Sequence, residues 1–511
     1  IGVLYWYLTR NFNYWSKRGV KGPKPWPIVG NILQLFTTPQ PLQELNWAKR
    51  YGKIYGIYLK EEPMLTVADP ELIKTILVKD FHLFPERANI SQSHDKIMSR
   101  NLVQLTGDDW KRVRSIVSPT FTSGKMKRMY PRIQECLSQL ITVLDTMATD
   151  GQSMNAKDLF GRYTMDVIAT CAFATKTCAD YTRDNPFVLM AKSAFTVRPL
   201  KTALTLSCPV FLLKLMAKLR PAPSSGAGFF FMDSTRRLIH ERQKSGHKSN
   251  DFLQLLCESE KDSEEDIKDE LDVNESHHIN EGSEELAVER KTLSINVVNK
   301  RLTEDEILAQ ALVFFLAGFE TTATTLTFLT YELAINPHIQ DSLYAEICAA
   351  VDANGDISYE ELARLPYLDS VLSETLRLHP PSLRLHRVAA ADYKLGDTGL
   401  TLYKGQTVQI GVYAVHTREE YYPDPFRFDP DRFMPENRHK LVPYTYVPFG
   451  AGPRNCIGMR FALLEAKIAV AHVMRRFRFT RVPQTAVPLG FKRGFRISVP
   501  DDVVVGVERR D

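Results

Sequence analysis

The stretch that decides the fold is Phe449-Gly450-Ala451-Gly452-Pro453-Arg454-Asn455-Cys456-Ile457-Gly458, which a helical run at residues 459–467 follows. Its one cysteine stands in a loop whose glycines lack Cβ atoms and can take positive φ, so a planar ligand can approach the backbone closely. Backbone N–H groups can then point at the sulfur, and the positive end of the following helix would lower the thiol pKa. We therefore expect Cys456 as a thiolate, the form that binds iron.

A lone cysteine in a turn is usually an ordinary buried side chain, but here the pattern Phe-x-x-Gly-x-Arg-x-Cys-x-Gly surrounds it. This pattern resembles the haem-binding signature of the cytochrome P-450 superfamily. In that family a cysteine thiolate is the axial ligand of the iron and favours O–O cleavage. The resemblance implies haem b as the cofactor, with Cys456 as the ligand of the metal and Phe449 beside the ring.

Two further segments extend the resemblance. Glu374-Thr375-Leu376-Arg377 resembles the family's E-x-x-R, and Pro430-Asp431-Arg432-Phe433 resembles its P-E-R-F, with Asp in place of Glu. Glu374 and Arg377 share a helix face. Such a pair alone is usually a surface salt bridge worth less than ~1 kcal/mol. With Arg432 added from a distant loop, we expect a buried network that holds the cysteine loop in place.

Ala317-Gly318-Phe319-Glu320-Thr321-Thr322 matches the family's oxygen-activation segment, A/G-G-x-D/E-T. A mid-helix threonine can bond the carbonyl four residues back, here that of Ala317, which bends a helix. Gly318 weakens the same turn, so a groove could open there. The alternative without a catalytic role is that the threonines only pack against a neighbouring helix where two helices cross. The resemblance instead assigns catalytic roles: Thr321 positions the proton donor and Glu320 feeds protons from solvent.

Haem carries two propionates, which need cationic partners if they are buried. Trp110 and Arg114 lie four apart on one helix face and match the family's W-x-x-x-R. Arg387 follows the prolines at 380 and 381, and Arg454 precedes the cysteine. A single arginine is ordinarily a solvated surface residue, so we select the three that lie within motifs, with Arg87 as a further candidate outside them.

Substrate contacts are taken from family position. They are Leu316 and Ala317 on the long helix, Ser382 and Leu383 after the prolines, and a roof formed by the variable segment 88–105. The run Phe229-Phe230-Phe231 has two readings: it packs in the core, or it dips into a membrane.

Helix boundaries are clear in three places. S/T-x-x-E capping boxes begin at Thr303 and at Ser358. The first helix should run without proline to Pro337, much longer than the ~12-residue mean. A third helix begins near Pro366 and ends at His379, because the following prolines cannot continue it.

The remaining periodicity is mostly helical, with one β signal near the N-terminus. Ile54–Leu59 and residues 64–68 are β-prone runs joined by Lys-Glu-Glu-Pro, which predicts a hairpin. The resemblance implies a mainly α fold with a smaller β part, the P-450 helical prism. Haem would lie between the long helix and the cysteine loop.

Four segments describe the domain organisation. Residues 1–20 are apolar, aromatic and then basic, typical either of the end of a membrane anchor or of a soluble N-terminal helix. Residues 21–30 form a proline-rich hinge, and 31–511 form one haem-binding catalytic domain. Within it, 258–300 is acidic and lacks periodicity, which predicts a mobile surface loop. Because the first residue is Ile1, we expect a fragment that begins downstream of the natural start.

Composition excludes several function classes. A net charge of +5 over 511 residues is too small to indicate nucleic acid as a partner. The seven cysteines include no C-x-x-C pair, which favours a reducing compartment without a disulfide framework.

The resemblance implies a monooxygenase that inserts one oxygen atom from O2 into a lipophilic substrate. The segments 109–114 and 383–387 look most like the animal microsomal group that includes drug-oxidising and thromboxane-forming enzymes. This group implies the endoplasmic reticulum membrane, with the catalytic domain facing the cytoplasm. Two rivals remain: a haem-thiolate isomerase, and a non-catalytic haem carrier or sensor. Neither needs the Glu320–Thr321 pair.

Electrons should come from NADPH through a separate flavoprotein reductase, since no G-x-G-x-x-G stands between a strand and a helix. The resemblance also allows cytochrome b5 as a second partner. A basic docking face for the reductase is expected at Lys111, Arg112, Lys125, Lys127 and Arg128.

Overall fold

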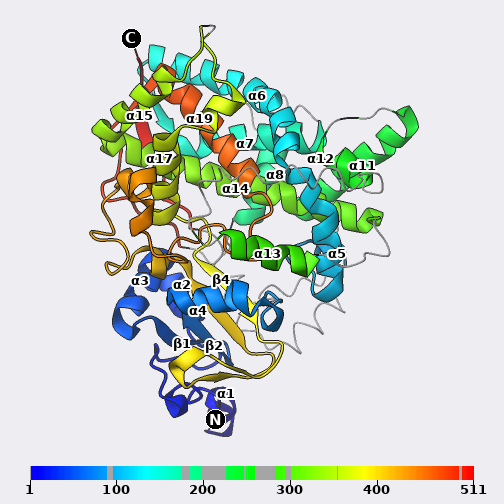
Figure 1. The fold of residues 1–511 in the computed structure, drawn as a ribbon, viewed down its shortest axis with the longest axis vertical. Helices are drawn as coiled ribbons and strands as arrows, with labels where there is room; N and C mark the ends of the chain where they lie inside the picture. The colour runs from blue at the N-terminus through cyan, green and yellow to red at the C-terminus, as the bar shows by residue number, and fades with distance from the viewer. Residues whose placement is uncertain are drawn as a thin grey trace.

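Helices make up most of the protein, and the larger sheet lies at the N-terminal end (Figure 1). The computed structural model describes residues 2–88, 96–174, 185–196, 226–246, 249, 251–258, 280, 282–293, 301–353, 355–493 and 498–510. The mainly α class with a smaller β part is confirmed.

The long helix α14 (Glu304–Ile335) begins at the predicted capping box. The Thr303 N–H donates to Glu306 Oε2 at 2.9 Å, and the Glu306 N–H donates to Thr303 Oγ1 at 3.3 Å. The helix is 32 residues long and ends before Pro337, as predicted. It is also long and apolar enough to span a membrane, but 72% of its most apolar window is buried within the protein. We therefore treat α14 as the central core helix.

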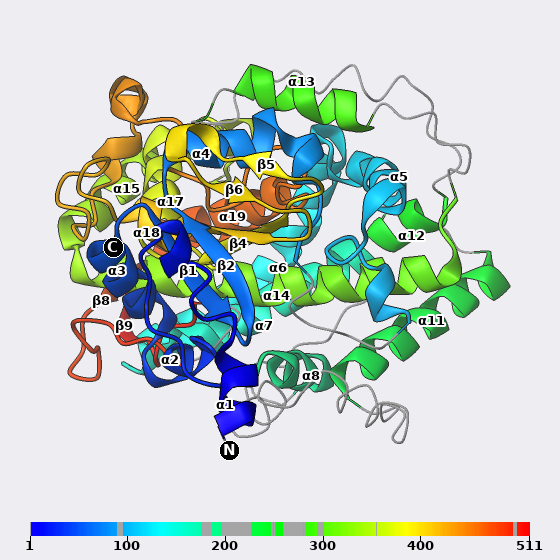
Figure 2. The ribbon, with the colours of Figure 1, turned by 90° about the horizontal axis from the view of Figure 1, so that it is seen from below.

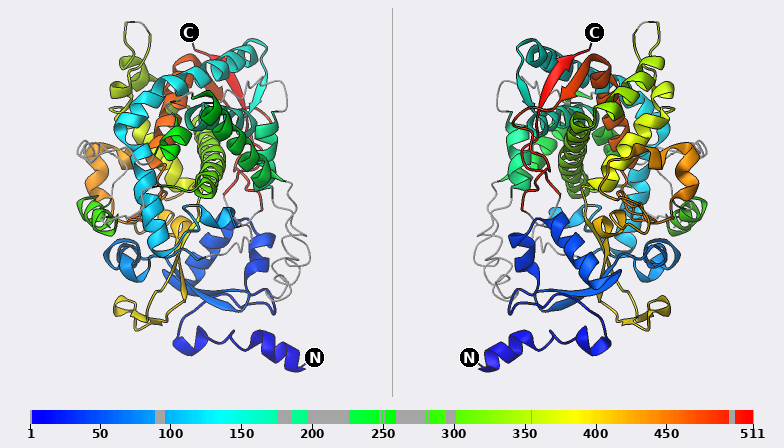
Figure 3. Two further views of the ribbon diagram at one scale, coloured as in Figure 1. Left: turned by 90° about the vertical axis from the view of Figure 1, so that its right-hand side faces the viewer. Right: turned by 90° about the vertical axis from the view of Figure 1, so that its left-hand side faces the viewer.

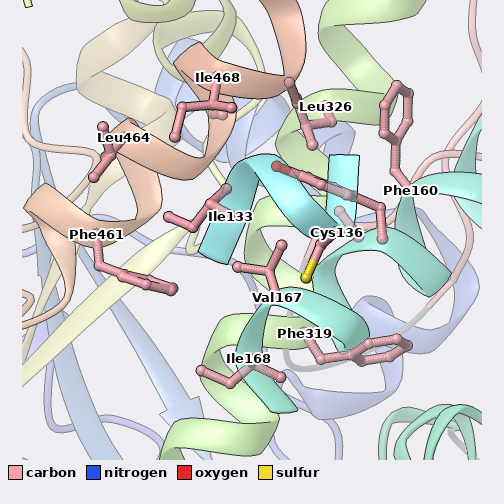
Figure 4. Close-up of a cluster of buried hydrophobic side chains, with 14 of the residues drawn as sticks. Ile133, Cys136, Phe160, Val167, Ile168, Phe319, Leu326, Phe461, Leu464 and Ile468 are labelled. Carbon is pink, nitrogen blue, oxygen red and sulfur yellow. The ribbon is translucent and has the colours of Figure 1, made fainter. Parts of the chain in front are cut away.

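Three helices pack around the centre of α14. Figure 4 shows their apolar side chains packed together: Ile133 and Cys136 from α6 (Ser123–Thr149), Val167 and Ile168 from α7 (Ala156–Phe173), Phe319 and Leu326 from α14, and Phe461 and Leu464 from α19 (Met459–Arg476). A Cβ on Gly318 would lie 3.0 Å from Ile168 Cδ1, so its missing side chain lets α7 approach α14 closely. This packing fixes the depth of the Glu320–Thr321 segment.

The other helices surround this core. They are α1 (Gly2–Thr9), α2 (Ile32–Thr37), α3 (Gln40–Tyr51), α4 (Pro70–Lys74), α5 (Gly107–Val117), α8 (Pro186–Phe195), α11 (Ala227–Ser245), α12 (Phe252–Cys257), α13 (Gly282–Leu293), α15 (Pro337–Ala349), α16 (Tyr359–Leu362), α17 (Pro366–Leu378) and α18 (Val412–His416). The predicted start and stop of α17 are confirmed, with His379 as its C-cap. Ser358 caps a helix as predicted, but α16 lasts only one turn.

The larger sheet has the order β1-β2-β7-β4, made of β1 (Ile54–Leu59), β2 (Glu62–Val67), β7 (Thr407–Gly411) and β4 (Arg384–Val388). The predicted hairpin is confirmed as β1 and β2, with Pro63 inside β2. Pro63 fits because the parallel pairing of β2 with β7 begins at Met64, so no ladder bond needs a proline N–H. A second sheet has the order β3-β9-β8, made of β3 (Ser153–Asn155), β9 (Val504–Arg509) and β8 (Phe477–Thr480); a third pairs β5 (Tyr393–Lys394) with β6 (Thr401–Leu402).

The N-terminal segments lie beside the larger sheet. The Gly56 N–H donates to the Lys21 carbonyl at 2.9 Å, and the Asn31 N–H donates to the Tyr58 carbonyl at 2.8 Å, so residues 21–31 are fastened to β1. The helix α1 projects from this end of the molecule (Figure 3), with Tyr5 60% and Trp6 66% exposed.

Of two predictions for the surface, one needs correction and one is decided in favour of the core. The acidic segment 258–300 is not loop throughout, because α13 forms within it and its carboxylates find basic and N–H partners elsewhere in the chain. Phe231 is fully buried, and its ring centroid lies 4.7 Å from that of Phe315, so the core reading of the Phe229-Phe230-Phe231 run is correct for Phe231. Phe229 is 47% exposed.

Candidate active site

The cysteine loop is folded back on itself. The Cys456 N–H donates to the Phe449 carbonyl at 2.9 Å, and the Gly458 N–H donates to the Cys456 sulfur. Gly452 has φ 67°, and a Cβ there would lie 2.0 Å from the Leu77 carbonyl oxygen, so only glycine fits. Gly458 has φ −91° and caps α19, so its function in the loop is the N–H donated to sulfur and not a positive φ.

Burial raises the pKa of the Cys456 thiol. The Gly458 N–H, Arg114 and Arg87 lower the pKa in part, but the expected net lowering is wrong because desolvation of the thiolate is the largest effect. Cys456 nevertheless has an exposed surface, and so has Ala317 in the middle of the buried α14. Because both residues keep accessible surface within otherwise buried segments, we infer that both face internal space.

Four arginines surround this space. Arg114 lies on α5, Arg387 on β4, Arg454 in the cysteine loop, and Arg87 after the turn Phe81–Leu83. Burial and the neighbouring guanidinium groups hold the pKa of Arg387 well below its usual range and lower that of Arg454 to about 9. Burial and Arg114 also lower the pKa of Arg87. Glu86 lies 3.1 Å from Arg454 and Glu289 lies 3.2 Å from Arg114, so four arginines meet two carboxylates and positive charge remains to be balanced.

Several of their N–H groups point to the same requirement. Within the described ranges, no hydrogen-bond partner is present for the Nε of Arg114, Arg387 or Arg454, nor for Nη1 of Arg454. Buried donors of this kind are normally satisfied. A ligand with two carboxylates, such as haem with its propionates, would supply both the charge and the acceptors.

The donor set also fits a metal that brings its own ligands. In the part of the chain that the structure describes, no group of three or more His, Cys, Asp or Glu side chains could hold an ion. One cysteine sulfur cannot fill a coordination sphere alone. Iron in a planar macrocycle needs only such an axial ligand from the protein.

Trp110 and Arg114 have separate tasks on α5. The guanidinium carbon of Arg454 lies 4.2 Å from the centroid of the buried Trp110 ring, a cation–π contact. Arg114 donates from Nη2 to Asn455 Oδ1 at 2.7 Å and from Nη1 to the Asn455 carbonyl at 3.1 Å. The W-x-x-x-R motif therefore holds the two residues that precede Cys456.

The oxygen-activation segment has the predicted local geometry. Thr321 Oγ1 donates to the Ala317 carbonyl at 2.7 Å. The helix continues unbroken through Gly318, so the groove expected there is not formed by a break in α14. Glu320 is buried, and its Oε1 lies 2.9 Å from Lys157 Nζ on α7. Lys157 also donates to Thr324 Oγ1 at 2.7 Å.

Lys157 was not identified from the sequence. It lies far from Glu320 along the chain, and it belongs to no motif. Burial lowers its pKa, which the Glu320 carboxylate partly reverses. The acid at position 320 is therefore paired with the partly exposed Lys157 amine, and the proton supply from solvent to Glu320 stays a prediction.

The substrate candidates differ in accessibility. Ala317 is exposed and Leu316 is half-buried. Ser382 is half-buried, and its Oγ donates to the Arg384 carbonyl at 3.0 Å. Leu383 is only 3% exposed, and its carbonyl accepts the Val412 N–H. The middle of the predicted roof, residues 89–95, lies outside the described residues.

The predicted Glu374 network is present, with Glu374 and Arg377 fully buried and Arg432 partly buried. Glu374 and Arg377 form two parallel bonds of 2.7 Å, and Arg432 Nε lies 3.5 Å from Glu374 Oε1. Arg377 Nη1 also donates to the His416 carbonyl at 2.9 Å. Bidentate geometry of this kind makes strong, directional charge-assisted bonds.

His416 connects this network to the cysteine loop, and no motif indicated it. Its Nε2 accepts the Val447 N–H at 2.9 Å, so its Nδ1 carries the proton and donates to the Arg377 carbonyl at 3.0 Å. Burial lowers the pKa of His416 to about 3. The ring is therefore neutral, and Val447 lies two residues before Phe449.

We expect His416 to make stability depend on pH. Its folded pKa is about 3 and its ordinary value 6.5, so only the unfolded chain takes up a proton between these values. The contribution is complete above pH 6.5 and is lost as pH falls, by up to about 1.4 kcal/mol per pH unit. Urea unfolding at pH 7, 6 and 5 should show a shallower pH dependence for His416→Gln than for wild type. The matched control is the exposed His439→Gln; equal slopes for wild type and His416→Gln would contradict the assignment.

Comparisons with known proteins agree with this geometry. The sequence profile of the family described as "Cytochrome P450" matches residues 20–502. Cytochrome P450 3A11 of Mus musculus is 35% identical over 516 residues, covering 100% of this chain and 95% of the relative. Cytochrome P450 3A7 of Homo sapiens is 34% identical with the same coverage. Cytochrome P450 9e2 of Blattella germanica is 35% identical, covering 99% of this chain and 96% of the relative.

Proposed function

This chain belongs to the cytochrome P450 family of haem-thiolate monooxygenases, and from that premise we propose which of its residues hold haem, move protons and meet the substrate. The enzyme inserts one oxygen atom from O2 into a lipophilic substrate with electrons from NADPH through a reductase. The observation that carries the assignment is Cys456, which keeps accessible surface, beside four crowded arginines, three of which have buried N–H groups without a hydrogen-bond acceptor in the described residues.

Haem, when bound, supplies the iron at which dioxygen is activated. Cys456 would be the metal ligand, and the Gly458 N–H would offset part of the sulfur's negative charge. Arg114, Arg387 and Arg454 would hold the propionates, and Arg87 is a fourth candidate. Trp110 would keep Arg454 in position through the ring contact, and Phe449 would border the ring.

Protons would reach the site along α14. Glu320 would take up a proton and donate it into the site. Lys157, on α7, would then supply the next proton to Glu320, and the 2.9 Å distance between Lys157 Nζ and Glu320 Oε1 supports this role. Thr321 holds its hydroxyl towards the accessible face that also contains Ala317. A positioned general acid typically contributes ~10²–10⁴-fold to a rate.

Thr321→Ala should separate oxygen activation from mere binding. We expect the variant to keep haem and substrate binding, while product formed per NADPH consumed falls by at least about tenfold and hydrogen peroxide rises. The measurement is product, NADPH and peroxide in one reductase assay under O2.

Thr327→Ala is the matched control, because Thr327 makes the same back-bond, to Ala323, on a buried part of α14. Unchanged coupling in Thr321→Ala would refute the role of that hydroxyl. Wild-type turnover without NADPH, reductase or O2 would indicate a haem-thiolate isomerase. If no lipophilic substrate were turned over, the protein would be a non-catalytic haem carrier or sensor.

We propose the endoplasmic reticulum membrane as the location, with the catalytic domain facing the cytoplasm. The exposed Tyr5 and Trp6 on α1, followed by basic residues, support a membrane-anchoring segment at 1–20. The organisation would then be this segment, the hinge at 21–30, and the catalytic domain at 31–511. Cytochrome b5 is proposed as a second electron donor beside the reductase.

The substrate is proposed to lie over Leu316 and Ala317, with Ser382 and Leu383 at its other side. The accessible Ala317 supports this placement most directly. The small alanine leaves room for the substrate near the Thr321 hydroxyl.

A further inference from the structure

The acidic helix α13 lies against the cysteine loop. Glu285, which is buried, accepts the Gly452 N–H at 3.2 Å. Glu289 Oε1 lies 3.2 Å from Arg114 Nη2, and Glu284 Oε2 lies 3.0 Å from Lys74 Nζ. Three carboxylates on one short helix thus bind the loop, α5 and α4.

This helix occupies an outer position. In Figure 2, α13 runs along the edge of the molecule beyond α4 and α5. Because Glu285 contacts Gly452, α13 covers the cysteine loop on this side. A helix is about 10 Å wide with its side chains. An electron donor approaching from this side is held away from the loop by that thickness.

The surface beneath α13 is basic. Lys74 and Arg114 contribute cations, and Gly452 contributes a backbone N–H. Lys111 and Arg112, two of the predicted docking residues, lie on the same helix as Arg114. A surface of this charge steers and binds an acidic protein. The carboxylates of α13 make the contacts that such a partner would make.

The attachment of α13 is suited to displacement. Glu284 and Lys74 are partly exposed, and pairs of that kind are weak and screened by salt. The apolar attachment is limited to partly buried side chains such as Val288 and Leu293. At 12 residues the helix is also marginal by itself. Its order therefore depends on contact with the basic surface.

We propose that α13 occupies in cis the surface on which the acidic electron donor docks, so that α13 and the donor compete for it. This inference rests on the proposed function, because it requires that a reductase supplies the electrons. The acidic helix would reduce donor docking until a donor of sufficient concentration replaces it.

The first test weakens α13 without changing its shape. Glu284→Gln combined with Glu289→Gln removes two ion pairs and leaves Glu285 on the loop. We expect the reductase concentration for half-maximal turnover to fall by roughly three- to tenfold, with the carbon monoxide difference spectrum and peroxide-supported turnover unchanged. Glu508→Gln, an exposed glutamate on β9, is the matched control and should not alter the reductase requirement.

The second test observes the helix itself. Hydrogen–deuterium exchange of residues 282–293 in the wild-type holoenzyme should accelerate when reductase is added, because displaced α13 loses its contacts. Protection of α13 by reductase, or an unchanged or raised reductase requirement in the double variant, would overturn competition and make α13 part of the docking surface. Failure of the proposed function would look different, because haem-loaded wild type would then lack its thiolate spectrum or its reductase-driven turnover.

Discussion

Cys456→His is expected to abolish the strongly red-shifted Soret band in the carbon monoxide difference spectrum of the reduced protein, together with all reductase-driven turnover. A thiolate pushes electron density onto the iron, whereas a neutral imidazole does not. The Gly458 N–H and the nearby Arg87 and Arg114 stabilise negative charge on the sulfur at this position. The spectrum of wild type and variant should be recorded side by side on haem-loaded protein.

Cys348→Ser is the control for this experiment, because Cys348 is an exposed cysteine distant from the loop in sequence. It should keep the band in full. If Cys456→His also kept the band, another cysteine would have to be the ligand. If haem-loaded wild type lacked it, the protein would use a different type of axial ligand.

Glu374→Ala is expected to give protein that does not retain haem. The substitution leaves the fully buried Arg377 without its carboxylate, and removal of one partner of a buried ion pair costs about 3–5 kcal/mol. That is a large fraction of the ~5–15 kcal/mol by which proteins are stable. Arg377 is bonded to His416, and His416 is bonded to Val447, so loss of Glu374 should also weaken the contacts that hold the cysteine loop. The measurement is the ratio of haem absorbance to protein absorbance after purification.

The chain contains its own control for this prediction. Glu361-Leu362-Ala363-Arg364 is a second E-x-x-R, with its Glu361 and Arg364 side chains exposed and their closest charged atoms 3.8 Å apart. Glu361→Ala should purify with a full complement of haem. A fully loaded Glu374→Ala would show that the buried network does not hold the loop.

These two copies of one motif show what sequence reasoning could and could not provide. The spacing predicts a shared helix face in both, and only the burial of α17 separates a structural network from a surface pair. The cysteine loop, the long capped helix and the hairpin were predictable because each is encoded locally, in glycines, a capping box and β-prone runs. The network could be predicted only through its likeness to known motifs.

Side chains that act across long sequence distances were missed. Lys157 and His416 are single residues without a repeating neighbour, and they meet Glu320 and Val447 only after the helices pack. The helix α13 was missed for a different reason. Its acidic composition resembles that of a solvated loop, and the cations and N–H groups that order it come from α4, α5 and the cysteine loop.

The close approach of Gly452 to the Leu77 carbonyl has a consequence for how the protein is made. The two residues lie far apart in the sequence, so Leu77 leaves the ribosome long before Gly452 is synthesised. The contact that fixes the shape of the cysteine loop can therefore form only after residue 452 has been synthesised. Contacts between such distant residues form slowly. Haem capture should then be among the last steps of biosynthesis, and a chain that stops before residue 452 should leave the N-terminal part without this partner.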